Sequence, residues 1–255
     1  MDSYRPKKWA DPDAKMQTES SELSEDAAAR PDNRSQYSMR PVFIKTQMVN
    51  QAAGSAYIEI QNTKVIVAVY GPRHNPKMAL SEEKGQLVCD FKYAPFATQT
   101  RRQSGQGDDE RAMSSWLKDA LITTVILEKF PKSVVEVFVT VLEADGGELA
   151  AAVIACSVAL ASARIEMYDL ISAHEVVRTN SRILVDPTLE ELNSCQSRLL
   201  LSFTQNLQEV TNILQAGNMS MSEFQEMYEA CLNGCKHLHE IMLQKLKKSM
   251  KKRIK

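Results

Sequence analysis

The sequence predicts an α+β domain in which mixed β-sheets are packed with helices. Three observations support this class. Several β-branched runs lie in the first hundred residues, and a further such run is followed by an Ala-rich stretch that covers 148–164. A long helical pattern lies near the C-terminus. Strand-like and helix-like segments alternate without strict strand-helix-strand units, as is typical of helix-covered mixed sheets. We therefore expect one domain of this class.

The first part of the chain is expected to form strands. Two of its runs are joined by the short polar turn Gln61-Asn62, which is typical of a hairpin, and Gly71-Pro72 is expected to end the third strand. A polar loop should then cover 101–109. The strands expected in this part are 42–48, 55–60, 63–70 and 87–93.

Later in the chain, helices and strands are expected to alternate. Apolar residues recur at helical spacing over 111–128, and acidic residues precede them where a helix N-terminus favours negative charge. Ser222 is the expected N-cap of the last helix. The elements expected here are a helix at 111–128, a strand at 134–143, a helix at 148–164, strands at 171–178, 181–185, 198–204 and 209–214, and a helix at 222–250.

Both ends of the chain differ from the middle in composition. Residues 1–37 hold few large apolar side chains, so we expect a disordered tail with Trp9 as a candidate docking anchor. The folded domain should cover 38–245. The basic tail 246–255 has three open interpretations: RNA contact, a nuclear localisation signal, or a solubilising helix end.

Composition restricts the class of protein further. The 31 basic and 32 acidic residues give a net charge of −1, so any binding to nucleic acid must come from local patches. The five cysteines lack the paired spacing of a zinc site or a disulfide framework, so we expect free thiols and no metal. No apolar run approaches the roughly 20 residues that span a bilayer, and the acidic N-terminus does not look like a signal peptide. We expect a soluble, intracellular protein.

The pentapeptide Asp145-Gly146-Gly147-Glu148-Leu149 is the most informative motif. It joins a β-branched run to the Ala-rich helix, and such a turn offers backbone N–H groups and the positive end of a helix dipole to an anion. A phosphate site would add Ser, Thr, Lys or Arg at this point. The chain instead supplies the carboxylate of Glu148 and the hydrocarbon of Leu149.

Several strings in a fixed order and spacing resemble the RNase PH family over about residues 38–245. Within that family the chain is most similar to ring subunits of the eukaryotic RNA exosome, of the mRNA-transport-regulator type. The resemblance implies the RNase PH-like fold, which is similar to domain 2 of ribosomal protein S5. The strings are Arg40-Pro41-Val42, Gly54-Ser55-Ala56-Tyr57, Thr63-Lys64-Val65, Tyr70-Gly71-Pro72-Arg73, Cys89-Asp90-Phe91 with Ala94-Pro95-Phe96, Ala144-Asp145-Gly146 and Glu166-Met167-Tyr168-Asp169-Leu170.

Active members of the family degrade RNA from its 3′ end by phosphorolysis, and the resemblance implies that this site is degenerate here. The phosphate-binding Gly-Ser-Arg of the family matches Gly147-Glu148-Leu149, so a cation is lost and a carboxylate is gained. In a gapless register the cationic pair of the family falls on Asp108 and Asp109. Asp186 matches the first acidic residue of the catalytic cluster, and Leu192 replaces the catalytic Asp.

Other candidate residues have more than one interpretation. Arg73, Arg101 and Arg102 lie where ring members of the family face RNA, or they form ordinary solvated loops. Asp186 with Glu190 and Glu191 could suggest a metal site, but a solvated turn is favoured because no further ligand completes the set. The remaining pairs, His237 with His239 and Cys231 with Cys235, are expected to pack or face solvent, as is His174.

The function expected from this resemblance is that of a non-catalytic structural subunit of the RNA exosome ring, with no cofactor. Its partners would be other RNase PH-like ring subunits, cap subunits with RNA-binding domains, a separate nuclease, and RNA, in the nucleus, nucleolus and cytoplasm. One alternative is an active phosphorolytic 3′–5′ exoribonuclease that shares its site with a partner. A second is a module with a repurposed pocket for a small molecule or nucleotide.

Overall fold

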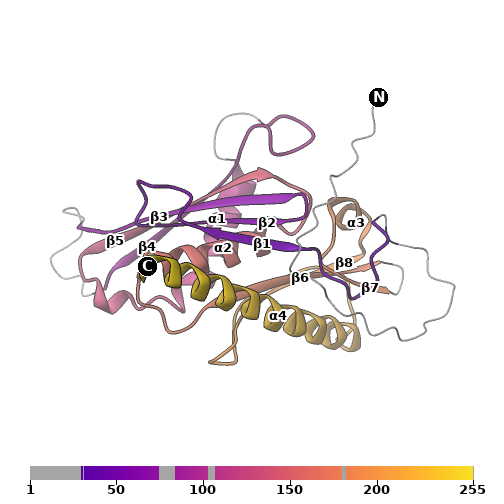
Figure 1. Cartoon of the computed structure of the whole chain (residues 1–255). Coiled ribbons are helices and arrows are strands. Elements are labelled where there is room, and N and C mark those ends of the chain that lie inside the picture. Colours follow the sequence, from indigo (N-terminus) through magenta and orange to yellow (C-terminus); the bar gives the residue numbers. More distant parts are fainter. Residues whose placement is uncertain (1–29, 31, 75–83, 103–106, 180–181, 255) are drawn as a thin grey trace.

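Two β-sheets and four α-helices make up the part of the chain that the structure, a computed structural model, describes: residues 30, 32–74, 84–102, 107–179 and 182–254 (Figure 1). This arrangement confirms the predicted α+β class. The predicted anchor Trp9 and most of the predicted tail lie outside the described residues.

The first sheet has the strand order β1-β2-β3-β5-β4. Its strands pair antiparallel except β4 and β5, which are parallel. A parallel pair needs a long crossover connection, and α1 (Asp108–Ile122) supplies it. The strands are β1 (Val42–Thr46), β2 (Gly54–Ile60), β3 (Thr63–His74), β4 (Gln86–Tyr93) and β5 (Ser133–Glu143).

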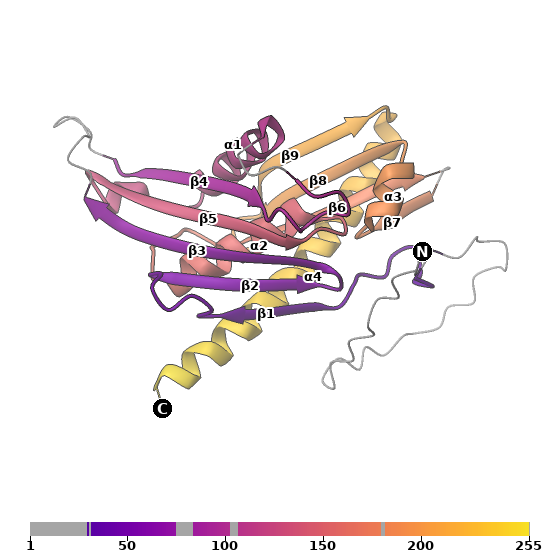
Figure 2. The same cartoon turned by 90° about the horizontal axis from the view of Figure 1, so that it is seen from above.

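The second sheet is antiparallel throughout, with the order β7-β6-β8-β9. Seen from above, it lies beside the first sheet, and the last helix, α4 (Met221–Ile254), runs beneath both (Figure 2). A short helix, α3 (Leu189–Ser194), joins β7 to β8. The strands are β6 (Ile171–Thr179), β7 (Arg182–Val185), β8 (Ser197–Thr204) and β9 (Glu209–Gly217).

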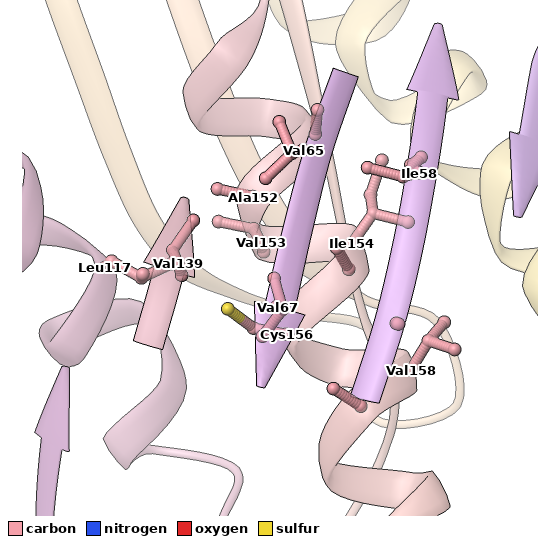
Figure 3. Close-up of a cluster of buried hydrophobic side chains, with 14 of the residues drawn as sticks. Ile58, Val65, Val67, Leu117, Val139, Ala152, Val153, Ile154, Cys156 and Val158 are labelled. Atoms are coloured by element: carbon pink, nitrogen blue, oxygen red, sulfur yellow. The ribbon is translucent and has the colours of Figure 1, made fainter. Parts of the chain in front are cut away.

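The Ala-rich helix α2 (Glu148–Ser162) forms the centre of the core. It is buried almost all round, as expected for a helix with apolar residues on every face. Its small side chains allow β2 to approach the helix closely. A Cβ added to Gly54 of β2 would lie only 2.4 Å from the Ala159 carbonyl oxygen. The main core cluster includes residues from both sheets, so both halves of the chain share it. Side chains from β2, β3, β5 and α1 surround the helix in Figure 3: Ile58, Val65, Val67, Leu117 and Val139.

Some predicted boundaries were wrong. The third strand continues past Gly71-Pro72, because Arg73 and His74 pair again with β5 after a register shift. The helix expected at 111–128 starts earlier, at Asp108, and stops at Ile122, since Val125 forms an antiparallel bridge with Met167.

The terminal segments also differ from expectation. The last helix extends to Ile254, so the expected basic tail is mostly helical. Its N-terminal capping contacts come from Ser220 rather than Ser222: the Glu223 N–H donates to Ser220 Oγ at 3.4 Å, and the Ser220 N–H donates to a Glu223 carboxylate oxygen at 2.7 Å. At the other end the folded body begins before residue 38, because Arg30 is buried against Glu191 of α3.

Candidate functional site

The turn before α2 is shaped by two glycines with positive φ. Gly146 has a φ of 85° and Gly147 a φ of 71°, which L-residues with a Cβ rarely adopt. A Cβ on Gly146 would also lie 2.7 Å from the Pro187 carbonyl oxygen, so the turn packs directly against the segment before α3. Thr63 Oγ1, at the start of β3, donates to the Gly146 carbonyl oxygen at 2.7 Å. The predicted strand-to-helix turn is confirmed.

The carboxylate of Glu148 folds back over this turn. Its Oε1 accepts the Gly146 backbone N–H at 3.0 Å, so a side chain of the protein uses a donor that the turn would otherwise present to an anion. The neighbouring Leu149 is half-buried and packs against the hydrophobic core. The turn therefore carries negative charge and an apolar side chain where a phosphate site needs donors and cations.

Asp186 is buried beside the turn in an ion pair with Arg40. Arg40 Nη2 lies 2.6 Å from Asp186 Oδ1, and the Arg40 backbone N–H donates to Asp186 Oδ2 at 2.8 Å. The same guanidinium donates to the carbonyl oxygens of Asp145 and Gly146, at 3.0 and 3.1 Å. Burial by itself would raise the pKa of Asp186, but the charge and hydrogen bonds of Arg40 outweigh it and hold that pKa at about 2. Asp186 thus fastens the segment before α3 to the turn as a carboxylate.

Two more arginines reach the backbone of Asp186 from the N-terminal segment. Arg30 Nη2 and Arg34 Nη2 donate to the Asp186 carbonyl oxygen at 3.1 and 3.2 Å. Arg30 also forms a two-bond pair with Glu191 of α3, with both N···O distances 2.7 Å. Glu191 therefore has a structural partner, so its place is not simply the solvated turn that the sequence suggested.

The loop after β4 brings further predicted residues to the same region. The Arg102 guanidinium lies over the Tyr93 ring, 4.1 Å from its centroid, and the buried Glu110 accepts the Tyr93 backbone N–H at 3.0 Å. Burial and the negative charges of Glu148, Glu110 and Asp109 raise the pKa of Tyr93, against the effect of Arg102. The structure therefore brings Asp109, Arg102 and Glu148 to one cluster around Tyr93.

Other predicted residues lie at the margin of this cluster or away from it. Asp108 and Arg101 are exposed, and Asp108 forms a 3.3 Å pair with Arg111 one turn along α1. Leu192 is half-buried in α3.

Arg73 lies far from the cluster. It is ten residues along β3 from Thr63, which is about 30 Å in an extended strand. There its guanidinium contacts the Tyr70 ring at 5.2 Å and Glu136 at 3.9 Å.

Sequence reasoning missed the charged residues that organise the site from within. Arg40 belongs to one of the family strings and Glu175 lies beside His174 in a β run, but the sequence around them does not indicate that they are buried in the site. Both Glu175 and His174 are buried next to Asp186, and they line a small cavity with Gly147. No local pattern marks such residues, because their partners come from other strands.

The described residues bear on several of the other expectations. No group of three or more His, Cys, Asp or Glu among them is placed to hold a metal, and no helix among them is long and apolar enough to cross a membrane. All five cysteines are free thiols. Cys231 and Cys235 are buried between α4 and the second sheet, which confirms that they pack.

Comparison with known protein families shows which family has this fold and this turn. Residues 38–166 match domain 1 of the 3′ exoribonuclease family, and residues 169–234 match its domain 2. The chain belongs to the RNase PH family. The first match covers β1 to α2, and the second covers β6 to the first part of α4, so the boundary falls between the two sheets.

Relatives of this RNase PH family member include named exosome components. It is 38% identical over 221 residues to "Exosome complex component RRP41-like" of Arabidopsis thaliana, covering 87% of this chain and 85% of the relative. It is 34% identical over 244 residues to "Exosome complex component MTR3" of Homo sapiens, covering 89% and 90%. These matches confirm the resemblance to exosome subunits that the sequence strings indicated.

Solved structures of the family share the fold. The crystal structure of Rrp46 from rice (Oryza sativa) aligns with a TM-score of 0.74 at 26% identity, covering 85% of this chain and all of the other. A chain from the Archaeoglobus fulgidus exosome with RNA bound to the active site aligns with a TM-score of 0.74 at 21% identity, covering 84% and 92%. The second likeness concerns the fold alone.

Proposed function

We propose that this RNase PH family member is a non-catalytic structural subunit of an RNA exosome ring. It would support 3′–5′ degradation and processing of rRNA and mRNA by scaffolding the complex and lining part of the RNA channel. One observation carries the non-catalytic assignment: the carboxylate of Glu148 occupies the turn before α2 and accepts the Gly146 N–H.

Electrostatics supports this assignment. A carboxylate about 4 Å from a phosphate costs on the order of 1 kcal/mol in water and about 4 kcal/mol at a partly shielded surface. The attraction of a helix N-terminus, roughly 0.3–1 kcal/mol, does not offset that repulsion, and Asp109 and Glu110 add negative charge around Tyr93 nearby. Leu149 supplies no cation, and Leu192 cannot transfer a proton.

The partners proposed for this subunit follow from its relatives. Since proteins named RRP41-like and MTR3 are exosome components, we expect other RNase PH-like subunits as ring neighbours. Cap subunits with RNA-binding domains and a separate nuclease would complete the assembly, in the nucleus, nucleolus and cytoplasm. Arg102 belongs to the cluster around Tyr93, and Arg101 is its neighbour in the sequence. With Arg73 they are the proposed contacts to the RNA backbone.

Diphosphate release tests the proposal. A 3′-labelled oligonucleotide with added inorganic phosphate should yield no nucleoside diphosphate with the pure chain or with its complex with a ring partner, whereas an active phosphorolytic relative should yield it. Release by the complex that disappears in the Asp186→Asn variant, with the folded state verified by circular dichroism, would favour the alternative of a shared active site.

A variant designed to gain phosphate binding tests directly whether Glu148 blocks the turn before α2. Changing Glu148→Ser with Leu149→Arg restores the family residues, so inorganic phosphate should then raise the melting temperature, since a ligand of the folded state stabilises it. The wild type and a variant with Glu190→Ser, which removes an exposed carboxylate from α3, should show no such rise. A rise in the wild type equal to that in the restored variant contradicts the proposal.

A further inference from the structure

The C-terminal turns of α4 concentrate positive charge that the proposed function does not use. After Glu240 the chain contains no acidic residue up to its last residue, although its net charge is only −1. The cations of this stretch are Lys245, Lys247, Lys248, Lys251, Lys252, Arg253 and Lys255. The rest of the chain holds 24 basic and 32 acidic residues, a net charge of −8, so the positive charge is concentrated at this end.

This end of the helix is held in place across β1. Lys245 Nζ lies 5.5 Å from the centroid of the Phe43 ring, and Ser249 Oγ forms a 2.8 Å hydrogen bond with Thr46 Oγ1. Leu246 packs against the main hydrophobic core. Figure 2 shows the helix end running out past β1, and both views place it at the opposite end of the molecule from α3 (Figures 1 and 2).

The lysines lie next to one another, and all but the half-buried Lys245 are exposed. Residues three and four apart are neighbours on a helix surface, so Lys251 adjoins both Lys247 and Lys248, and Lys248 adjoins Lys245. Lys45 is exposed on β1, the strand that this end of the helix crosses. The name "basic end" is used below for these five: Lys45, Lys245, Lys247, Lys248 and Lys251.

The charges of the basic end are not neutralised within the described part of the chain. None of its five lysines forms an ion pair within 4 Å with another described residue, whereas Lys64, Lys92 and Lys129 each have a carboxylate partner. Cations at a helix C-terminus favour the helix, but that effect concerns only the last turn. Here the cations begin at Lys245, more than two turns before the helix ends at Ile254.

We propose that the basic end binds the phosphate backbone of RNA, at a place separate from the turn before α2 and from Arg101 and Arg102. Lysine ammonium groups act as point charges, which suits contact with successive phosphates and does not read bases. RNA is the polyanion to expect because the chain belongs to a family of exoribonucleases. RNA bound here would lie along the outer edge of the sheet and need not enter a channel.

An anionic lipid surface is the competing occupant of a basic helix. Such a helix needs a continuous apolar face to enter the headgroup region. Next to the basic end, Leu246 packs against the hydrophobic core. Among the described side chains after Leu246, Met250 is the one large apolar side chain that is exposed, at 62%. The observations therefore favour a phosphate polymer in solution over a membrane.

Salt-dependent RNA binding by the full chain, alone or with a ring partner, tests this proposal. The probe is a fluorescently labelled single-stranded RNA of mixed sequence, and the variant changes Lys247, Lys248 and Lys251 to Gln. The loss of three phosphate contacts should weaken binding on the order of tenfold near 0.1 M salt. It should also reduce the slope of log K against log salt by about two.

Matched variants separate a local site from a change in net charge. Changing the exposed Lys84, Lys118 and Lys236 to Gln removes the same charge elsewhere and should leave the slope unchanged. Changing Lys247, Lys248 and Lys251 to Arg should restore wild-type binding, and circular dichroism checks that α4 remains folded. Equal effects of the two Gln variants overturn the proposal, as does RNA binding that both leave intact.

Binding to lipid vesicles tests the alternative that the basic end contacts a membrane. If the Gln variant of the basic end loses binding to vesicles containing phosphatidylserine while its RNA binding is unchanged, the surface is a membrane site and the proposal is wrong. Because this readout is RNA affinity rather than diphosphate release, failure of the basic end leaves the non-catalytic assignment unaffected.

Discussion

His174 and Glu175 are adjacent buried residues on β6 whose pKa values move in opposite directions. Burial lowers the pKa of His174 from 6.5 to about 4, with Asp186 acting against it. Burial and the nearby charge of Glu148 raise the pKa of Glu175 from 4.5 to about 7, against Arg198 and Arg40. Both side chains are therefore favoured in their neutral forms next to the Arg40–Asp186 pair.

The two shifts have opposite consequences for stability. A raised acid pKa means that the folded state holds the proton more tightly, so Glu175 lowers the free energy of unfolding as the pH rises from 4.5 to about 7. The lowered pKa of His174 means that the unfolded state binds the proton better, so its contribution rises between pH 4 and 6.5. Between pH 4.5 and 6.5 these contributions largely cancel.

Changing Glu175→Gln should remove the pH-dependent contribution of Glu175 to the free energy of unfolding. The free energy of unfolding of the variant minus that of the wild type should grow by roughly 3 kcal/mol between pH 4.5 and pH 7, and then stay level. Urea denaturation across this pH range measures the difference. The exposed Glu190→Gln variant should show no such trend, and a pH-independent difference for Glu175→Gln would contradict a raised pKa.

At the scale of elements, α4 docks on β6 through a glycine. A Cβ on Gly234 would lie 2.2 Å from His174 Cδ2 and 2.6 Å from Cγ, so the imidazole ring occupies the space that a larger residue at this position would need. The same helix packs Cys231 and Cys235 against carbonyl oxygens of the second sheet. Around Gly234 the contact between helix and sheet is therefore set by side-chain volume, whereas near the start of α4 Glu223 forms an ion pair with Arg178 of β6.

Changing Gly234→Ala should destabilise the protein by about 1–3 kcal/mol, since the methyl group overpacks the contact. At an unhindered helix position the same change would stabilise by about 1 kcal/mol. Thermal or urea unfolding measures the cost. In a His174→Ala background the methyl group has space, so the cost should fall by at least about 1 kcal/mol; an unchanged cost would mean that His174 is not the obstacle.

At the scale of the whole molecule, each sheet of the described residues has two outer strands, which have a neighbouring strand on one side only. β1 and β4 end the first sheet, and β7 and β9 end the second. Large apolar side chains are also exposed on β4 and β5, with Val88 at 46% and Phe138 at 40%. Exposed apolar side chains and outer strands favour association, which agrees with the proposed ring subunit. The edge of β4 is partly covered, because Phe91 and Tyr93 donate their N–H groups to Ser114 and Glu110 of α1.

The isolated chain should therefore tend to aggregate, and it should form a stable pair with a related partner. Unlike neighbours would close the proposed ring, so self-association should not satisfy its surfaces. Co-expression with the correct RNase PH-like partner should give a soluble one-to-one pair with a raised melting temperature. Light scattering and thermal unfolding test this. A well-behaved monomer whose melting temperature no ring subunit changes would favour the repurposed binding module instead.

Arg101 and Arg102 should contribute to RNA binding by the assembled complex as backbone contacts. Changing both to Glu should weaken binding similarly for different RNA sequences and reduce the salt slope by up to about two. A matched variant with the exposed Lys118 and Lys236 changed to Glu should have a smaller effect. A loss confined to one RNA sequence, or no loss, would count against this role.

The sequence by itself determined most of the local structure of this protein, although not the short helix α3. Alternating β-branched runs and the Ala-rich stretch indicated the strands and α2, because period and propensity act over a few residues. The strand-to-helix turn at Gly146-Gly147 was also predictable, since few residues other than glycine adopt its positive φ. The family strings extended this reading to the fold as a whole.

Only the tertiary structure decided which charges meet. Arg40 and Asp186 are 146 residues apart, and Arg30 and Glu191 are 161 residues apart, yet each pair is buried in direct contact. The early start of the folded body and the buried roles of His174 and Glu175 depend on the same long-range packing. Local patterns do not carry this information, because an ion pair depends on distance in space, and burial sets its strength.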